Sequence, residues 1–327
     1  MSKKSLLYYA CVAIAILVAV IFCSRPMMKQ QTPATNTIHP VKNAIYYWRT
    51  VYRPSEKELE FLEQHHVGRM YLRMFDVIEG ETLPEPNATV RFAQAIPKDM
   101  EIIPTVFITT DAIRRVETEN DMEDLAIRIV RRITRICDWN GIEQWKEVQL
   151  DCDWTEHTSE DFFKLCRYVK KHLPEGKLLS CTIRLHQLRE SPPPVDYGVL
   201  MVYNTDDFRN PKATNSILND STVETYLKNV NNYHLPMDIA LPIYQWNLVY
   251  DKSGNFKRIA ARWEWDIDST ETVKFESVPY TTLHRTQDLL YKYLHLKHGR
   301  FSTILYHLNE TNINNYSHEE FKSIYNR

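Results

Sequence analysis

Glycine is scarce in this sequence, with seven among 327 residues. Neither a G-x-G-x-x-G run nor a G-x-x-x-x-G-K-[ST] run is present. Phosphate-binding loops need glycines because backbone amides must approach phosphate oxygens closely, so the scarcity argues against nucleotide-dependent enzymes. The G-x-S-x-G elbow that carries the nucleophile of α/β-hydrolases is missing as well, which argues against that class.

Charge and cysteine usage exclude further classes. The formal net charge is −2, the sequence pI is about 6.6, and no basic stripe is present, so no nucleic-acid partner is expected. The six cysteines show neither C-x-x-C spacing nor neighbouring histidine pairs, so we expect no metal and no other cofactor. We interpret them as free buried thiols, with a disulfide as the alternative. They are Cys11, Cys23, Cys137, Cys152, Cys166 and Cys181.

The N-terminus carries one long uncharged stretch, residues 6–23, which follows Lys3 and Lys4. It is long enough to cross a bilayer as a helix, and no A-x-A cleavage site follows it. Residues 1–24 therefore predict a membrane anchor that places the rest of the chain outside the cytoplasm, in the cell envelope. A lipoprotein signal lipidated at Cys23 is the alternative, although Phe22 is bulky for that processing. Residues 25–41, which include three prolines, predict an exposed linker.

Strand-like and helix-like segments alternate from residue 42 onward. Ser55 and Glu58 form a capping box at the first helix, and Gly68 is expected to end it. Eight near-continuous apolar strands, most of them followed by a helix, predict a (β/α)₈ TIM barrel over residues 42–327. A small insertion at about 251–280 is expected between strand seven and the last helix. The predicted strands are 44–48, 70–75, 101–108, 148–155, 178–185, 198–203, 239–244 and 301–306.

Polar side chains concentrate at the carboxyl ends of these strands, where barrels of this kind build their sites. Asp151 and Asp153 alternate on the fourth strand, so they share one face about 7 Å apart. Such a pair suits acid–base chemistry, and desolvation beside Trp154 would raise the pKa of Asp153. The alternative is that Arg184 from the next strand pairs with Asp153 and leaves a binding cleft without catalysis. Glu156 reaches the cleft only if a turn begins at Trp154.

Three stretches in order resemble motifs of the family-18 glycoside hydrolase superfamily, the chitinase-like barrels. Val148 to Thr155 is similar to D-x-x-D-x-D-x-E, Met201 to Asn204 to M-x-Y-D, and Ala240 to Tyr244 to G-L-P-x-Y. The opening strand, Ile45 to Trp48, is also similar to that of the family. The resemblance spans about residues 44 to 310 and implies a barrel that acts on an oligo- or polysaccharide.

The departures from the family pattern concern its chemistry. Thr155 stands where the family has the glutamate that protonates the leaving oxygen, and Val148 replaces the first aspartate of the motif. Asn204 replaces the aspartate that follows the sixth-strand tyrosine. Residue by residue, only Asp151, Asp153 and Tyr203 carry over from the family.

Two carbohydrate hypotheses and a third of another kind remain open. The first is a glycoside hydrolase that uses Asp151, Asp153 or Glu156. The second is a glycan-binding module without catalysis, and the third is an envelope scaffold. An aromatic and acidic run at 262–268 would wall the cleft or simply pack on the rim. The expected ligand contacts are Trp48, Arg73, Arg184, His186, Tyr203, Asn204, Tyr244, Trp246 and His307.

Overall fold

The computed structural model describes residues 40–260, 268–295 and 301–326. The predicted anchor, the predicted linker up to residue 39, and the aromatic and acidic run except Asp268 lie outside these ranges. Within them, no helix is long and apolar enough to cross a membrane.

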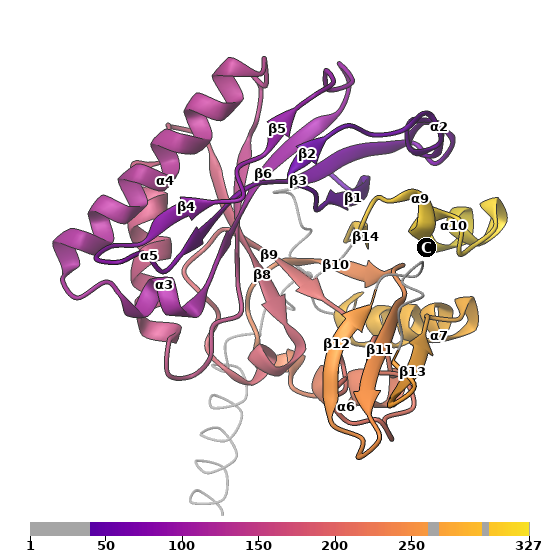
Figure 1. Ribbon diagram of the computed structural model, residues 1–327. Coiled ribbons are helices and arrows are strands. Elements are labelled where there is room, and N and C mark those ends of the chain that lie inside the picture. The colour runs from indigo at the N-terminus through magenta and orange to yellow at the C-terminus, as the bar shows by residue number, and fades with distance from the viewer. Residues whose placement is uncertain (1–39, 261–267, 296–300, 327) are drawn as a thin grey trace, which may run out of the picture.

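Eight parallel strands close into a barrel, as the sequence predicts (Figure 1). They run in the order β1-β14-β10-β9-β8-β7-β6-β3, and β1 closes the ring by pairing with β3. The chain therefore has the TIM-barrel fold. The strands are β1 (Asn43–Tyr47), β3 (Val67–Ile78), β6 (Glu101–Ile108), β7 (Glu147–Cys152), β8 (Leu178–Arg184), β9 (Tyr197–Met201), β10 (Met237–Pro242) and β14 (Thr303–Tyr306).

Helices follow most of these strands and cover the outside of the barrel (Figure 1). The predicted capping box starts the first of them, since the Ser55 hydroxyl accepts from the Glu58 amide and the Glu58 carboxylate accepts from the Ser55 amide. The helices and helical turns are α2 (Glu56–Gln64), α3 (Thr110–Arg114), α4 (Glu119–Trp139), α5 (Ser159–His172), η1 (Leu185–Arg189), α6 (Asp220–Leu227), η2 (Val230–Asn232), α7 (Tyr280–Leu290), η3 (Tyr291–His295), α9 (Glu310–Ile313) and α10 (His318–Tyr325).

The period-two alternation of the strands separates two cores. On β7, Leu150 and Cys152 belong to the large apolar core between the barrel and its helices. Gln149 and Asp151 face the barrel interior, where the Tyr46 hydroxyl donates to the Gln149 carbonyl at 2.8 Å. The strand thus gives its apolar side to the helices and its polar side to the interior, which positions Asp151 below the barrel mouth.

A column of phenol rings fills the interior above its lower end. Tyr46 stacks on Tyr71 with ring centroids 4.9 Å apart and meets Tyr306 at 5.4 Å. Tyr306 in turn lies 4.9 Å from Tyr203. These contacts carry the aromatic packing from the middle of the barrel to its mouth.

A buried ion cluster closes the lower end of the interior. The Arg69 side chain is 0% exposed, lies 3.0 Å from the Glu101 carboxylate and lies 3.8 Å from the Asp238 carboxylate. A lone buried charge is costly, so these carboxylates offset the cost of burying the Arg69 charge in the barrel interior.

Several elements differ from the sequence expectation. Gly68 lies inside β3, and α2 ends at Gln64, four residues before it. Two helices, α9 and α10, follow the eighth strand, so the long helix before that strand is not the last one. The Phe61 and Phe321 rings, on α2 and α10, lie 4.8 Å apart, so the end of the described chain packs against the first helix. Three short strands also escaped prediction: β2 (Val51–Tyr52), β4 (Glu85–Asn87) and β5 (Arg91–Phe92).

The insertion is a small antiparallel sheet that begins earlier than the predicted residue 251. It consists of β11 (Trp246–Asp251), β12 (Phe256–Ala260) and β13 (Glu271–Glu276), with β11 in the centre. Figure 1 shows this sheet in orange. Trp246 pairs with Glu276 in its register, so the sheet starts directly at the exit of β10 and can wall the barrel mouth.

The cysteines that the structure describes are free and buried. They are Cys137, Cys152, Cys166 and Cys181, whereas Cys11 and Cys23 lie outside the described residues. Burial raises the pKa of the Cys137 thiol to about 12. The interpretation as inert apolar thiols is therefore confirmed for these four.

The neutral His65 makes folding depend on pH. Its side chain packs against the Phe61 ring and is 5% exposed. Burial, together with the charges of His318 and His66, lowers the pKa of His65 from 6.5 to about 4. The unfolded chain therefore binds a proton first as the pH falls, so the free energy of unfolding should drop by up to about 3 kcal/mol between pH 6.5 and pH 4. Urea denaturation across this range would measure the loss.

The matched variants are His65→Phe and His234→Phe, because His234 is exposed. We expect the His65 variant to lose about that much of the pH dependence and the His234 variant to retain it. Identical pH profiles for the wild type and the His65 variant would contradict the assignment.

Candidate functional site

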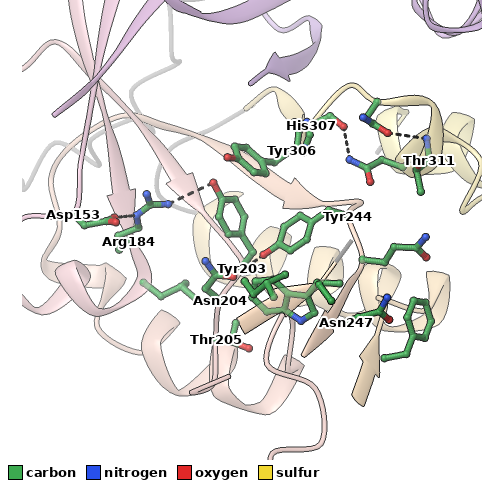
Figure 2. A pocket seen from close by; sticks show the side chains of 18 of the residues that line it. Asp153, Arg184, Tyr203, Asn204, Thr205, Tyr244, Asn247, Tyr306, His307 and Thr311 are labelled. Carbon is green, nitrogen blue, oxygen red and sulfur yellow. Dashed lines mark hydrogen bonds and ion pairs between the residues drawn. The ribbon is translucent and has the colours of Figure 1, made fainter. Parts of the chain in front are cut away.

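A cleft of about 690 Å³ opens at the mouth of the barrel. The carboxyl ends of β8, β9, β10 and β14 form its floor, and the insertion sheet forms one wall (Figure 2). Its lining includes Asp153, Arg184, His186, Tyr203, Asn204, Thr205, Tyr226, Tyr244, Gln245, Trp246, Asn247, Phe275, Tyr306, His307, Asn309, Thr311 and Asn312.

Arg184 connects the two carboxylates of the fourth strand. Its Nε atom donates to Asp153 Oδ1, and its Nη2 atom lies 3.2 Å from Asp151 Oδ1. Its Nη1 atom donates to the Tyr203 hydroxyl at 3.4 Å (Figure 2). The side chain is 18% exposed, so one guanidinium sits between two acids and a phenol at the floor of the cleft.

Asp151 lies beneath this guanidinium. It is 3% exposed and also accepts a hydrogen bond of 2.6 Å from the Thr182 hydroxyl. Burial raises the pKa of Asp151, and the Arg184 charge opposes that rise. Burial would lower the pKa of Arg184, but the Asp151 carboxylate, with Tyr203 and Asp153, raises it well above its usual value. Asp151 therefore serves as the buried counter-ion that fixes the arginine.

Aromatic rings line the other side of the cleft. The Tyr244 ring meets Tyr203 edge to face at 6.0 Å and Trp246 at 5.5 Å. The Trp246 Nε1 atom donates to Glu276 at 3.0 Å, and Glu276 also accepts from the Ser216 amide at 2.9 Å. The indole is therefore held by a buried carboxylate, and the rings form a fixed apolar wall of the kind on which sugar rings stack.

Asn204 turns the chain where β9 ends. Its φ is +52°, in the left-handed region that asparagine tolerates better than most residues with a side chain. Its Oδ1 atom accepts a hydrogen bond of 2.6 Å from the Tyr244 hydroxyl. Asparagine thus tolerates the left-handed backbone conformation at this turn, and its side chain orients the Tyr244 ring without adding a charge to the cleft.

Burial favours the uncharged form of both histidines and of two tyrosines in the cleft. Burial, with the Arg49 charge, lowers the pKa of His307 to about 4, and burial also lowers that of His186. Burial raises the pKa of the Tyr203 and Tyr244 phenols, so both hydroxyls keep their protons. Within the part of the chain that the structure describes, no three His, Cys, Asp or Glu side chains gather as metal ligands do.

Most of the predicted ligand contacts meet in this one cleft. The predicted contacts at or after the ends of the fifth to eighth barrel strands line the cleft together. Trp48 and Arg73 line a neighbouring hollow instead. The contacts that share the cleft are Arg184, His186, Tyr203, Asn204, Tyr244, Trp246 and His307.

The predicted catalytic residues do not meet. Asp153 lines the cleft with its side chain 59% exposed, but Asp151 is buried, so the expectation that both open into the barrel mouth holds for Asp153 alone. Glu156 is exposed outside the cleft lining. Trp154 is fully buried, and the Glu156 carbonyl accepts from the Ser159 hydroxyl at 2.9 Å, so this turn does not carry Glu156 inward. Among the cleft-lining residues described, Asp153 is the one carboxylate.

Sequence reasoning named Trp246 of the insertion sheet but missed two other residues of this sheet that line the cleft. Asn247 on β11 and Phe275 on β13 are register partners, and both line the cleft. Phe275 is 55% exposed, which is unusual for a large apolar side chain. The alternation Thr272, Val273, Lys274, Phe275 is the strand signal that would have located this wall.

Comparisons with known proteins show similarity in structure alone. No protein-family model matches the sequence, and no curated protein matches it. Among solved structures, the fold is similar to the spore cortex-lytic enzyme SleL of Bacillus cereus, with TM-score 0.57 and 12% identity, covering 87% of this chain and 73% of that one. A chitinase from Bacteroides thetaiotaomicron gives TM-score 0.54 and 11% identity, covering 88% and 97%.

A family-18 (GH18) chitinase from Cycas revoluta, solved as a mutant in complex with (GlcNAc)4, gives TM-score 0.50 and 11% identity, covering 87% of this chain and 99% of that one. The chain thus has the glycoside hydrolase-like barrel fold of these chitinases. At such identities the likeness concerns the fold alone.

Arg184 should be essential to stability because it neutralises a buried acid. We expect Arg184→Met to lower the free energy of unfolding by about 3–5 kcal/mol, since it leaves Asp151 buried without a counter-ion. Adding Asp151→Asn to that variant should recover part of the loss. Guanidinium denaturation would measure both changes.

The matched control is Arg114→Met. Arg114 pairs with Asp111 at 3.3 Å, but both side chains are more than half exposed. Its loss should change stability by less than about 1 kcal/mol. Equal effects of the Arg184 and Arg114 variants would show that the ion pairs of Arg184 with Asp151 and Asp153 do not stabilise the fold.

Proposed function

We propose that this chain is a carbohydrate-binding protein that holds a glycan in the cleft at the barrel mouth and does not hydrolyse it. The observation that carries the proposal is the Arg184 bridge. The one carboxylate among the described cleft-lining residues, Asp153, is ion-paired with Arg184, and Arg184 is anchored below on Asp151.

Glycoside hydrolysis needs a proton donor at the leaving oxygen. The Asp153 carboxylate instead accepts a hydrogen bond from the Arg184 guanidinium, so it is already engaged as an acceptor. Asp151 does not supply one either, because it is 3% exposed beneath the guanidinium. Thr155, at the position of the family's acid, has no acidic proton, so among the described residues none is placed as the acid for the leaving oxygen.

Binding, in contrast, needs no proton donor of that kind. Tyr244 and Trp246 offer ring faces for sugars, and amides and hydroxyls around them offer donors and acceptors for sugar hydroxyls. The similar solved structures support a saccharide as the ligand, since they are chitinases and a cortex-lytic enzyme, and one of them was solved with (GlcNAc)4. Chitooligosaccharides and peptidoglycan fragments are therefore the first probes.

Calorimetric titration with (GlcNAc)4, (GlcNAc)6 and muropeptides tests binding. We expect saturable binding to at least one probe and a loss of roughly tenfold or more in affinity for Trp246→Ala, as for other anchoring aromatic side chains. Trp139→Ala is the matched control, because Trp139 is 80% exposed on α4 and does not line the cleft.

A reducing-end assay on the same glycans separates the hypotheses. The proposal expects no release of product from the wild type. Release that Asp153→Asn abolishes would establish a hydrolase instead, since Asp153 is open to the cleft. The absence of both binding and release would leave the scaffold hypothesis.

The cellular location remains a proposal from the sequence. We propose that residues 1–24 hold the barrel outside the cytoplasm at a membrane. Cell fractionation should place the full chain with the membranes, whereas a variant without residues 1–24 should leave them. Release on Cys23→Ser alone would identify the lipoprotein alternative, and an unanchored full chain would contradict both forms.

A further inference from the structure

A second hollow, of about 610 Å³, lies at the barrel mouth beside β2 and β5. Its lining is rich in one residue type, since four of its seven residues are arginines. We refer to it as the arginine hollow. It is lined by Trp48, Arg49, Thr50, Val51, Arg53, Arg73 and Arg91.

Two of these arginines are neutralised within the protein. Arg49 lies 2.6 Å from the Glu58 carboxylate and places its guanidinium 4.4 Å from the centre of the Tyr47 ring. Arg73 donates through Nε to Asp76 Oδ1 at 2.8 Å. These contacts fix both guanidinium groups in place, as arginine forks are fixed when they meet a carboxylate.

The other two arginines, Arg53 and Arg91, have no such partner. Both side chains are exposed, and neither guanidinium makes a hydrogen bond or ion pair with any residue that the structure describes. Their backbones are nevertheless held, because the Arg53 amide donates to the Tyr47 hydroxyl at 2.9 Å and the Arg91 amide donates to the Thr50 carbonyl at 2.9 Å. The hollow therefore presents two unpaired positive charges on an ordered rim.

One aromatic ring links the arginine hollow to the cleft. Trp48 lies 5.8 Å from the ring of Tyr306, which lines the cleft. The Arg73 guanidinium also lies 5.5 Å from the centre of the Trp48 ring. A chain of sugar rings that leaves the cleft over Tyr306 would thus meet Trp48 next and then the arginines.

We infer that the ligand of this protein is an anionic glycan, with sugar rings in the cleft and carboxylate or sulfate groups on Arg53 and Arg91. This inference rests on the proposed function and names its ligand class. Arg184 already meets Asp151 and Asp153, so among the described residues that line the cleft no arginine or lysine is left unpaired for an acid group. The planar guanidinium forks on the rim match the oxygens of a carboxylate or a sulfate.

Three probes of similar length separate the sources of negative charge. They are an oligogalacturonate hexamer with carboxylates, a chondroitin sulfate hexamer with both groups, and neutral (GlcNAc)6. We expect at least one anionic probe to bind about tenfold or more tightly than the neutral one at low salt. That preference should shrink as the ionic strength rises, because the rim is exposed.

The test variant is the double change Arg53→Gln and Arg91→Gln. It should remove the preference for the anionic probe and leave the affinity for (GlcNAc)6 unchanged. The matched control is Arg131→Gln with Arg135→Gln, which removes the same charge from exposed positions on α4, beside another hollow. The control should keep the preference.

Two results would overturn the inference alone. One is a neutral probe that binds as tightly as the anionic ones. The other is an equal loss of anionic binding in both double variants, which would show plain attraction between opposite charges. If none of the glycans binds, both the inference and the proposed function fail. A neutral glycan whose binding depends on Trp246 would preserve the proposed function while the anionic preference is lost.

Discussion

The site depends on one arginine that lies between two acids. Arg184 is held in position by the buried carboxylate of Asp151. It also forms an ion pair with the Asp153 carboxylate, which faces the cleft. Removing a buried counter-ion is costly, so the fold itself holds the guanidinium at the floor of the cleft. In the proposed function, the contact that stabilises the barrel mouth also engages Asp153, the carboxylate that faces the cleft.

The barrel reaches this arrangement through its interior. The cluster around Arg69 closes the lower end, stacked tyrosines such as Tyr46 fill the middle, and Arg184 with Tyr203 closes the mouth. Each layer comes from alternate residues of neighbouring strands, while the intervening residues pack against the helices. Within these layers, the Tyr46 hydroxyl donates to Gln149 and the Arg69 guanidinium donates to Glu101. The cleft is the upper surface of this column.

The sequence predicts the barrel because its apolar runs, its helix caps and the order of its strands all agree. It also predicts that Asp151 and Asp153 share a face, since strand parity settles that. Parity says nothing about depth, so the burial of Asp151 could not be foreseen. The insertion sheet was placed too late, because the alternation at its start is short and follows directly on a buried strand. Contacts between the first and the last strand of the barrel, such as that of Trp48 with Tyr306, form only when the barrel closes. No local sequence pattern predicts them.

The most direct test of the central claim is a crystal structure of the chain soaked with the glycan that binds it most tightly. We expect an intact saccharide stacked along Tyr244 and Trp246, with Arg184 still bridging Asp151 and Asp153. A cleaved product in the cleft, with Arg184 displaced and Asp153 against the glycosidic oxygen, would contradict it.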